Sequence, residues 1–81
     1  MKVDWQQLMA AIDRGLNAAE NEERGGLRLH CGSAERMLKK ARGEPAKTVR
    51  VKVHGARTAI EIETSVTYLK EARDLVTQVI S

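Results

Sequence analysis

The segment from Thr48 to Glu63 alternates apolar and polar residues, and this pattern constrains the fold more than any other part of the chain. The apolar residues of the alternation are Val49, Val51, Val53, Ile60 and Ile62. A period of two is typical of a β-strand with one buried face, so the segment predicts an antiparallel β-hairpin. A two-residue turn at Gly55-Ala56 would place Arg50 opposite Glu61 on the exposed face.

The N-terminal part of the chain carries the signals of a helix. Asp4 is a favourable N-cap, and Gln7 follows it at the capping-box position. Apolar residues then recur at helical spacing, which predicts a helix over residues 5–20. The Gly25-Gly26 pair is expected to end it.

Two short elements are predicted between this helix and the hairpin. Apolar and polar residues alternate over Leu27–Cys31, which indicates a short strand. Ser33 can cap a second helix with small and aliphatic residues along one side, and Gly43 and Pro45 are expected to end that helix.

A last helix is predicted over 66–80, with Ser65 or Thr64 as its N-cap. The expected order is therefore helix, strand, helix, strand, strand, helix. This order is typical of an α+β fold, here one compact domain spanning 1–81 with an antiparallel hairpin packed against helices. Phe is absent and the chain has a single Trp and a single Tyr, so the core is expected to be aliphatic.

The composition also bears on location. No apolar run approaches the roughly 20 residues that a membrane-spanning helix needs, and no signal peptide is recognisable, so we expect no membrane partner. The single cysteine, Cys31, fits a reducing compartment. We therefore expect the protein in the cytoplasm. If a phage encodes it, this would be the cytoplasm of the host cell, or the protein would be in the virion.

The charges are unevenly distributed along the sequence. Residues 25–57 hold nine Lys and Arg residues against two Glu residues, whereas the segments before and after are mildly acidic. The net charge of +3 therefore conceals a strongly basic central block. Such a block attracts phosphate groups or an acidic protein surface.

Seven side chains of this block are predicted to form the binding surface. Arg36, Lys39 and Lys40 are spaced i, i+3 and i+4, so they would share one face of the second helix. The other members follow this helix or lie on the predicted hairpin. The full predicted set is Arg36, Lys39, Lys40, Arg42, Lys47, Lys52 and Arg57. Side chains of this kind contact phosphates well and bases poorly.

Groups that could support catalysis are few. His30 and Cys31 are adjacent, so on a strand they would face opposite sides and could not act as a base and nucleophile pair. The sequence also lacks the CxxC or HxxxH spacing of common metal sites. We therefore expect no enzymatic activity, no catalytic residues, no metal site and no cofactor.

Residues 55–70 resemble a known family. The segment includes Arg57, Glu61, Thr64-Ser65-Val66 and Leu69-Lys70, and it looks like the hairpin-to-helix part of the W-type head-completion proteins of tailed phages. Those proteins join the filled head to the tail. The resemblance implies a non-enzymatic virion component that lies close to packaged DNA in a ring, with subunit contacts through the helices at 5–20 and 66–80.

Three functions follow from these observations. The first is a small non-catalytic binding protein, encoded by a phage or mobile element, whose basic central face engages nucleic acid or a nucleic-acid-handling protein complex. The second is a phage head-completion structural protein that forms homo-oligomers. The third is a phage-encoded inhibitor of a host defence complex, of the anti-CRISPR type.

Overall fold

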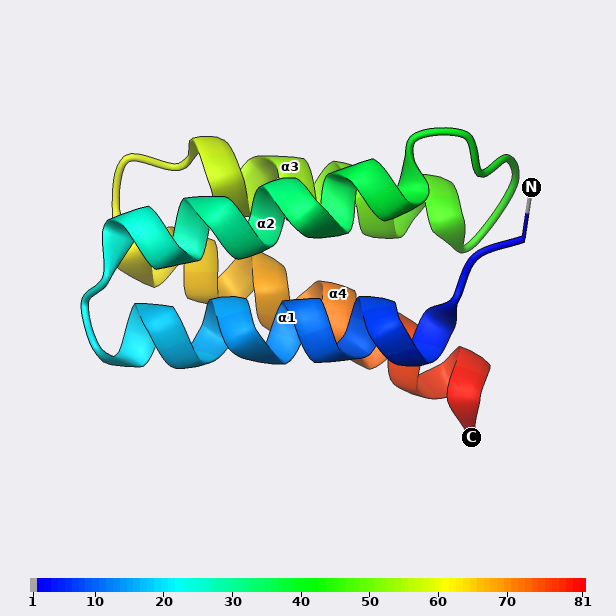
Figure 1. Ribbon diagram of the computed structural model, residues 1–81, viewed down its shortest axis with the longest axis horizontal. Coiled ribbons are helices and arrows are strands. Elements are labelled where there is room, and N and C mark those ends of the chain that lie inside the picture. Colours follow the sequence, from blue (N-terminus) through cyan, green and yellow to red (C-terminus); the bar gives the residue numbers. More distant parts are fainter. Residues whose placement is uncertain (1) are drawn as a thin grey trace.

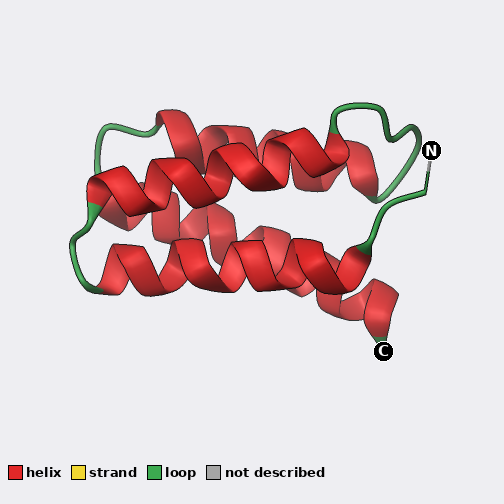
Figure 2. Cartoon of the chain, viewed as in Figure 1, coloured by secondary structure: helices red, strands yellow, loops and turns green. Residues whose placement is uncertain are grey.

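The computed structural model describes residues 2–81, which form four α-helices joined by short loops (Figure 1, Figure 2). The helices are α1 (Trp5–Glu20), α2 (Arg24–Leu38), α3 (Ala46–Thr58) and α4 (Ile62–Ile80). Each helix packs against two others, because α1 and α3 both contact α2 and α4. Both chain ends lie at the same end of the molecule in Figure 1. The arrangement is therefore an up-and-down four-helix bundle, and it measures 32 × 23 × 16 Å.

The predicted α+β class is wrong, because the part of the chain that the structure describes contains no strand. The hairpin expected over Thr48–Glu63 is instead α3, a short link and the first turn of α4. The burial of the valines shows why: Val49 and Val53 are fully buried, whereas Val51 between them is 59% exposed. Burial thus follows the i, i+4 spacing of a helix and ignores the period-two alternation.

The burial and the ion pair that were expected within the hairpin are wrong as well. Ile60, which the alternation placed on the buried face of the hairpin, is 85% exposed in the link before α4. Arg50 is not paired with Glu61, because its guanidinium points to the carbonyl oxygen of Leu38 at 3.5 Å. A helix that also has an apolar residue on its exposed face can show the same local alternation as a strand. Here packing against the other helices determined which of the two structures forms.

The strand predicted over Leu27–Cys31 and the separate helix after Ser33 are also wrong, because both belong to α2. The buried residues of α2 recur at helical spacing: Leu27, Cys31, Ala34 and Leu38. Gly25 and Gly26 do not end α1 but lie in the first turn of α2. A Cβ atom on Gly26 would be 3.3 Å from the Cβ of Ala18, so this glycine lets α1 and α2 approach closely.

The predictions for the ends of the helices had mixed outcomes. The start of α1 is confirmed, since the backbone N–H of Gln7 donates to the Asp4 side chain at 3.1 Å. The predicted caps of the last helix are wrong, because α4 begins at Ile62. Ser65 is instead buried, and its hydroxyl donates to the carbonyl oxygen of Ala56 at 2.7 Å, which ties α4 to α3.

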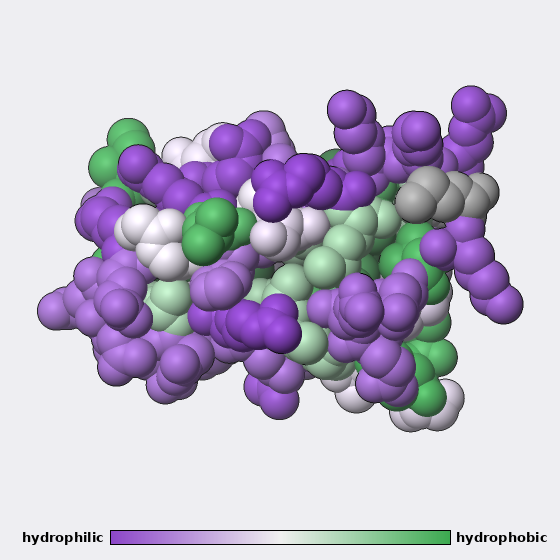
Figure 3. Space-filling view, in the orientation of Figure 1, coloured by the Kyte–Doolittle hydropathy of each residue, from purple (hydrophilic) through white to green (hydrophobic). Residues whose placement is uncertain are grey.

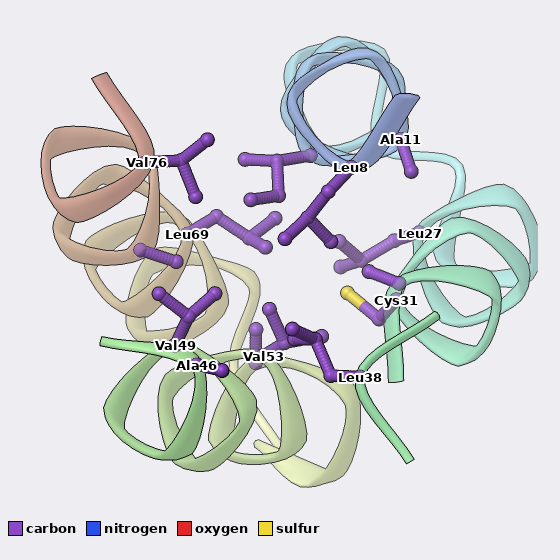
Figure 4. Packing of buried hydrophobic residues seen from close by; sticks show 14 of the residues in the cluster. Leu8, Ala11, Leu27, Cys31, Leu38, Ala46, Val49, Val53, Leu69 and Val76 are labelled. Carbon is purple, nitrogen blue, oxygen red and sulfur yellow. The ribbon is translucent and has the colours of Figure 1, made fainter. Parts of the chain in front are cut away.

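The core runs along the centre of the bundle and is aliphatic apart from Cys31 (Figure 4). Figure 4 shows Leu8, Leu27, Leu69, Val53 and Val76 pointing inward from all four helices. Most apolar residues of α1 and α4 thus face this core, whereas Val79 and Ile80 at the end of α4 are exposed. Contacts between subunits through residues 5–20 and 66–80 stay a prediction. No helix in residues 2–81 is both long and apolar enough to cross a membrane.

The resemblance of residues 55–70 to head-completion proteins included a hairpin. That hairpin is absent, because Gly55 lies inside α3 and Leu69 lies inside α4. The family resemblance itself stays a prediction.

Candidate functional site: a basic groove between α2 and α3

The outer surfaces of α2 and α3 leave an open groove of about 720 Å³ between them. Its α2 wall consists of Gly32, Glu35, Arg36 and Lys39. Its α3 wall consists of Arg50, Val51, His54 and Arg57. A second concavity of about 610 Å³ continues from it along the α2–α3 loop, and the two share Lys39 and Arg50. We call the two concavities together the basic groove.

The loop section of the basic groove is almost entirely cationic. Its charged residues are Lys39, Lys40, Arg42, Lys47 and Arg50. Long hydrophilic side chains project from the part of the surface where the α2–α3 loop lies (Figure 3). Glu44, a carboxylate of the same loop, accepts a hydrogen bond from the backbone N–H of Thr48 in the first turn of α3. This carboxylate is therefore engaged with the helix terminus.

Seven Lys and Arg side chains line the groove in all, against one carboxylate, Glu35. Among residues 2–81, only Arg57 of these seven forms a salt bridge, between its Nε and Oε2 of Glu35 at 3.0 Å. The other six cations have no carboxylate partner within ion-pair distance in the described residues. The groove therefore carries a concentrated, uncompensated positive charge.

Six of the seven predicted binding residues lie together in this groove: Arg36, Lys39, Lys40, Arg42, Lys47 and Arg57. Lys52 does not, because α3 directs it toward α4. Its Nζ lies 2.8 Å from Oε1 of Glu71 and 5.8 Å from the centre of the Tyr68 ring. The hydrogen bond to Glu71 raises the pKa of Lys52. Lys52 is thus a surface ion pair outside the groove.

Arg50 is a groove residue that the sequence prediction missed. The hairpin register assigned it to an ion pair with Glu61 on an exposed strand face. The helical spacing of Lys47, Arg50 and Arg57, at i, i+3 and i+10, would have placed it with the other cations. That signal is visible only once the segment is recognised as a helix.

A cluster of three side chains occupies the other end of the groove. Nδ1 of His54 lies 2.9 Å from Oε1 of Glu35 and 3.2 Å from a terminal guanidinium nitrogen of Arg57. Nδ1 can donate to Glu35 or accept from Arg57, but not both at once. The Glu35 side chain is only 20% exposed, and both of its oxygens have partners in the cluster. The positive charge of Arg57 is consequently balanced by Glu35.

The groove contains few groups other than cations. Within the described residues, no three His, Cys, Asp or Glu side chains are placed to hold a metal ion together. Cys31 lies behind the groove in the core, and burial, followed by the charge of Glu35, raises the pKa of its thiol to about 11. It is therefore a neutral thiol at physiological pH.

No protein family model matches this chain, and comparison with curated proteins and with solved structures gives no match. The geometry and charge of the groove are thus the basis for the function proposed next.

Proposed function

We propose that this protein binds nucleic acid without catalysing a reaction, and that the basic groove holds the phosphate backbone. One observation carries this proposal: seven cations from α2, the α2–α3 loop and α3 converge on one concave surface whose lining contains a single carboxylate, Glu35. Lys and Arg side chains bind phosphates through charge and hydrogen bonds, and they do so largely independently of base sequence.

The length of the groove suits a short stretch of backbone. Lys47 and Arg57 are ten residues apart on α3, which corresponds to about 15 Å along the helix axis. Phosphates of one strand follow each other at about 3.4 Å along a helical nucleic acid, so about four or five of them would lie along this distance. The number of unpaired cations is of the same order.

Fluorescence anisotropy with a labelled oligonucleotide, measured over a range of salt concentrations, tests this proposal. The logarithm of the binding constant should fall linearly with the logarithm of the salt concentration, by about 0.7 for each phosphate neutralised on a single strand. In the double variant Lys39→Glu/Lys40→Glu, binding should weaken by at least about tenfold and the salt slope should decrease by about one or two. The thermal midpoint should change little, because both side chains are exposed.

The matched control is Lys70→Glu/Arg73→Glu, which changes the net charge equally but on α4, outside the groove. It should retain most of the affinity. Equal losses in both double variants would contradict a localised site and indicate a response to net charge alone. Absence of oligonucleotide binding by the unaltered protein at about 50 mM salt would overturn the proposal, since such contacts are strongest at low salt.

A further inference from the structure

The basic groove has two sections of different chemistry. The loop section presents Lys39, Lys40, Arg42 and Lys47, which have no carboxylate partner within ion-pair distance in residues 2–81. The section between the helices also carries cations, namely Arg36, Arg50 and Arg57. Its lining differs from that of the loop section in including the exposed apolar side chain of Val51, together with Gly32, and we call these two residues the floor. A ligand that consisted of phosphates alone would leave the floor unused.

The uncharged floor is open because of a glycine. An added Cβ on Gly32 would meet only the Arg36 guanidinium, at 3.6 Å, so no neighbouring helix requires a glycine here for close packing. Glycine is unfavourable inside a helix, and at this position it leaves space on the floor of the groove. Val51 lies across from it on α3 and exposes 59% of its surface. The floor therefore offers apolar surface that the fold itself does not cover.

The charged groups beside this floor can accommodate a flat uncharged group. The Glu35 carboxylate lies in the same section and is paired with Arg57, so this section has fewer unpaired cations than the loop section. The guanidinium groups of Arg36 and Arg50 belong to the same lining. Guanidinium planes stack on nucleobases, which bind well to proteins where an apolar surface and a planar cation meet.

We propose that the basic groove binds single-stranded nucleic acid, with backbone phosphates in the loop section and an unpaired base on the Gly32–Val51 floor. This inference rests on the proposed function and specifies its substrate. A duplex cannot use the floor in this way, because its bases are stacked on one another and their faces cannot lie against a protein side chain. A single strand can turn a base outward.

The test compares three labelled oligonucleotides of about 12 nucleotides, which is within the usual site size for one small domain. They are oligo(dT), an abasic strand with the same number of phosphates, and a duplex. Anisotropy is measured with the unaltered protein and with Gly32→Gln, which fills the floor without changing the charge. Gly25→Gln is the matched control, because Gly25 also lies in α2, has nothing within 4 Å of an added Cβ and is outside the groove. Circular dichroism confirms that each variant is folded.

The unaltered protein and Gly25→Gln should bind oligo(dT) about tenfold more tightly than the abasic strand, which is the size of effect expected for one bound base. In Gly32→Gln this difference should disappear, while the abasic strand binds as before and the salt slope is unchanged. Equal binding of oligo(dT), the abasic strand and the duplex by the unaltered protein would overturn the inference and leave the proposed function intact. Binding of poly-glutamate with no binding of any oligonucleotide would overturn both, in favour of an acidic protein partner.

Discussion

The α1–α4 seam and the α2–α3 groove are built alike, but one is closed and the other is open. Each is formed by two packed helices, and each has a glycine near the middle of one helix. A Cβ on Gly15 in α1 would lie 3.2 Å from Cδ1 of Leu69, so this glycine is needed for the close approach of α4. Gly32 in α2 has no such neighbour. The same residue type therefore closes one interface and leaves space in the other.

The charges at the two interfaces differ in the same way. The surface beside the α1–α4 seam has two carboxylates, Asp13 and Glu20, and two cations, Lys70 and Arg73. Asp13 and Arg73 form a salt bridge across the seam at 3.2 Å. The groove has a large surplus of cations instead. A four-helix bundle does not by itself produce such a surplus, and this supports a binding role for the groove.

The largest change in the free energy of unfolding is expected from a substitution in the closed α1–α4 seam. Leu69→Ala should lower the free energy of unfolding by about 2–5 kcal/mol, because the fully buried leucine contacts Gly15 and its loss leaves a cavity. Val51→Ala on the groove floor should change it by less than about 0.5 kcal/mol. Urea denaturation monitored by circular dichroism measures both. Similar losses would show that Val51 is buried and that the groove is not open.

The next effect depends on the exclusion of water from the core behind the groove, where the Cys31 thiol of α2 is buried. The pKa of Cys31 is raised to about 11 in the folded protein, mainly by burial, from an ordinary value of 9.0. Below pH 9 the thiol is neutral in both the folded and the unfolded protein, so its full contribution to the free energy of unfolding is present. As the pH rises from 9 to 11, the unfolded chain loses the proton first, so the free energy of unfolding falls by up to about 2–3 kcal/mol.

Cys31→Ala removes this dependence and provides the comparison. Urea denaturation under reducing conditions should show the unaltered protein losing about 2 kcal/mol more than the variant between pH 8 and pH 11. All other titratable groups are the same in both proteins, so their contributions cancel in the difference. Parallel pH profiles would mean that water reaches the thiol and that the core behind the groove is not dry.

Replacing each of the two glycines by alanine should change the free energy of unfolding by a smaller amount, and the two changes should have opposite signs. Gly32→Ala should raise the free energy of unfolding by about 0.5–1 kcal/mol, because alanine is the better helix former and the added methyl group has space. Gly15→Ala gains the same helix propensity but forces Leu69 to move, so we expect a net loss of about 1 kcal/mol. Thermal denaturation of the two variants gives the comparison. A gain at both sites would show that the seam can relax at little cost.

The glycines and valines also show why the sequence predicted the fold only in part. The helix at residues 5–20 was predictable because its cap and its apolar spacing both lie within one short segment. Gly25-Gly26 was taken for a helix end, but Gly26 is required by the approach of Ala18 from another helix, which a local pattern cannot reveal. The alternation around Val51 fitted a strand because the sequence alone does not show that Val51 faces an open groove.

The candidate site was more predictable than the fold. Six of the seven predicted cations lie together because Arg36, Lys39, Lys40, Arg42 and Lys47 are close in sequence around one loop. Arg50 and Lys52 were misassigned because a strand and a helix direct residues two apart differently. The partners of Glu35 could not be predicted at all, since they lie 19 and 22 residues away on α3.

The smallest effect is expected at the salt bridge across the seam. Asp13→Asn should lower the free energy of unfolding by less than about 0.5 kcal/mol, because both side chains are about half exposed and water screens the pair. The difference from the unaltered protein, measured by urea denaturation, should vanish at about 1 M salt, where charges are screened within about 3 Å. Oligonucleotide affinity should stay the same, since Asp13 lies outside the groove. A loss above about 1 kcal/mol at low salt that disappeared at about 1 M salt would mean that the ion pair, and not the contact of Gly15 with Leu69, holds the seam closed. In that case the difference between the two interfaces would arise from charge pairing, and adding a carboxylate partner for the groove cations would be enough to close the groove.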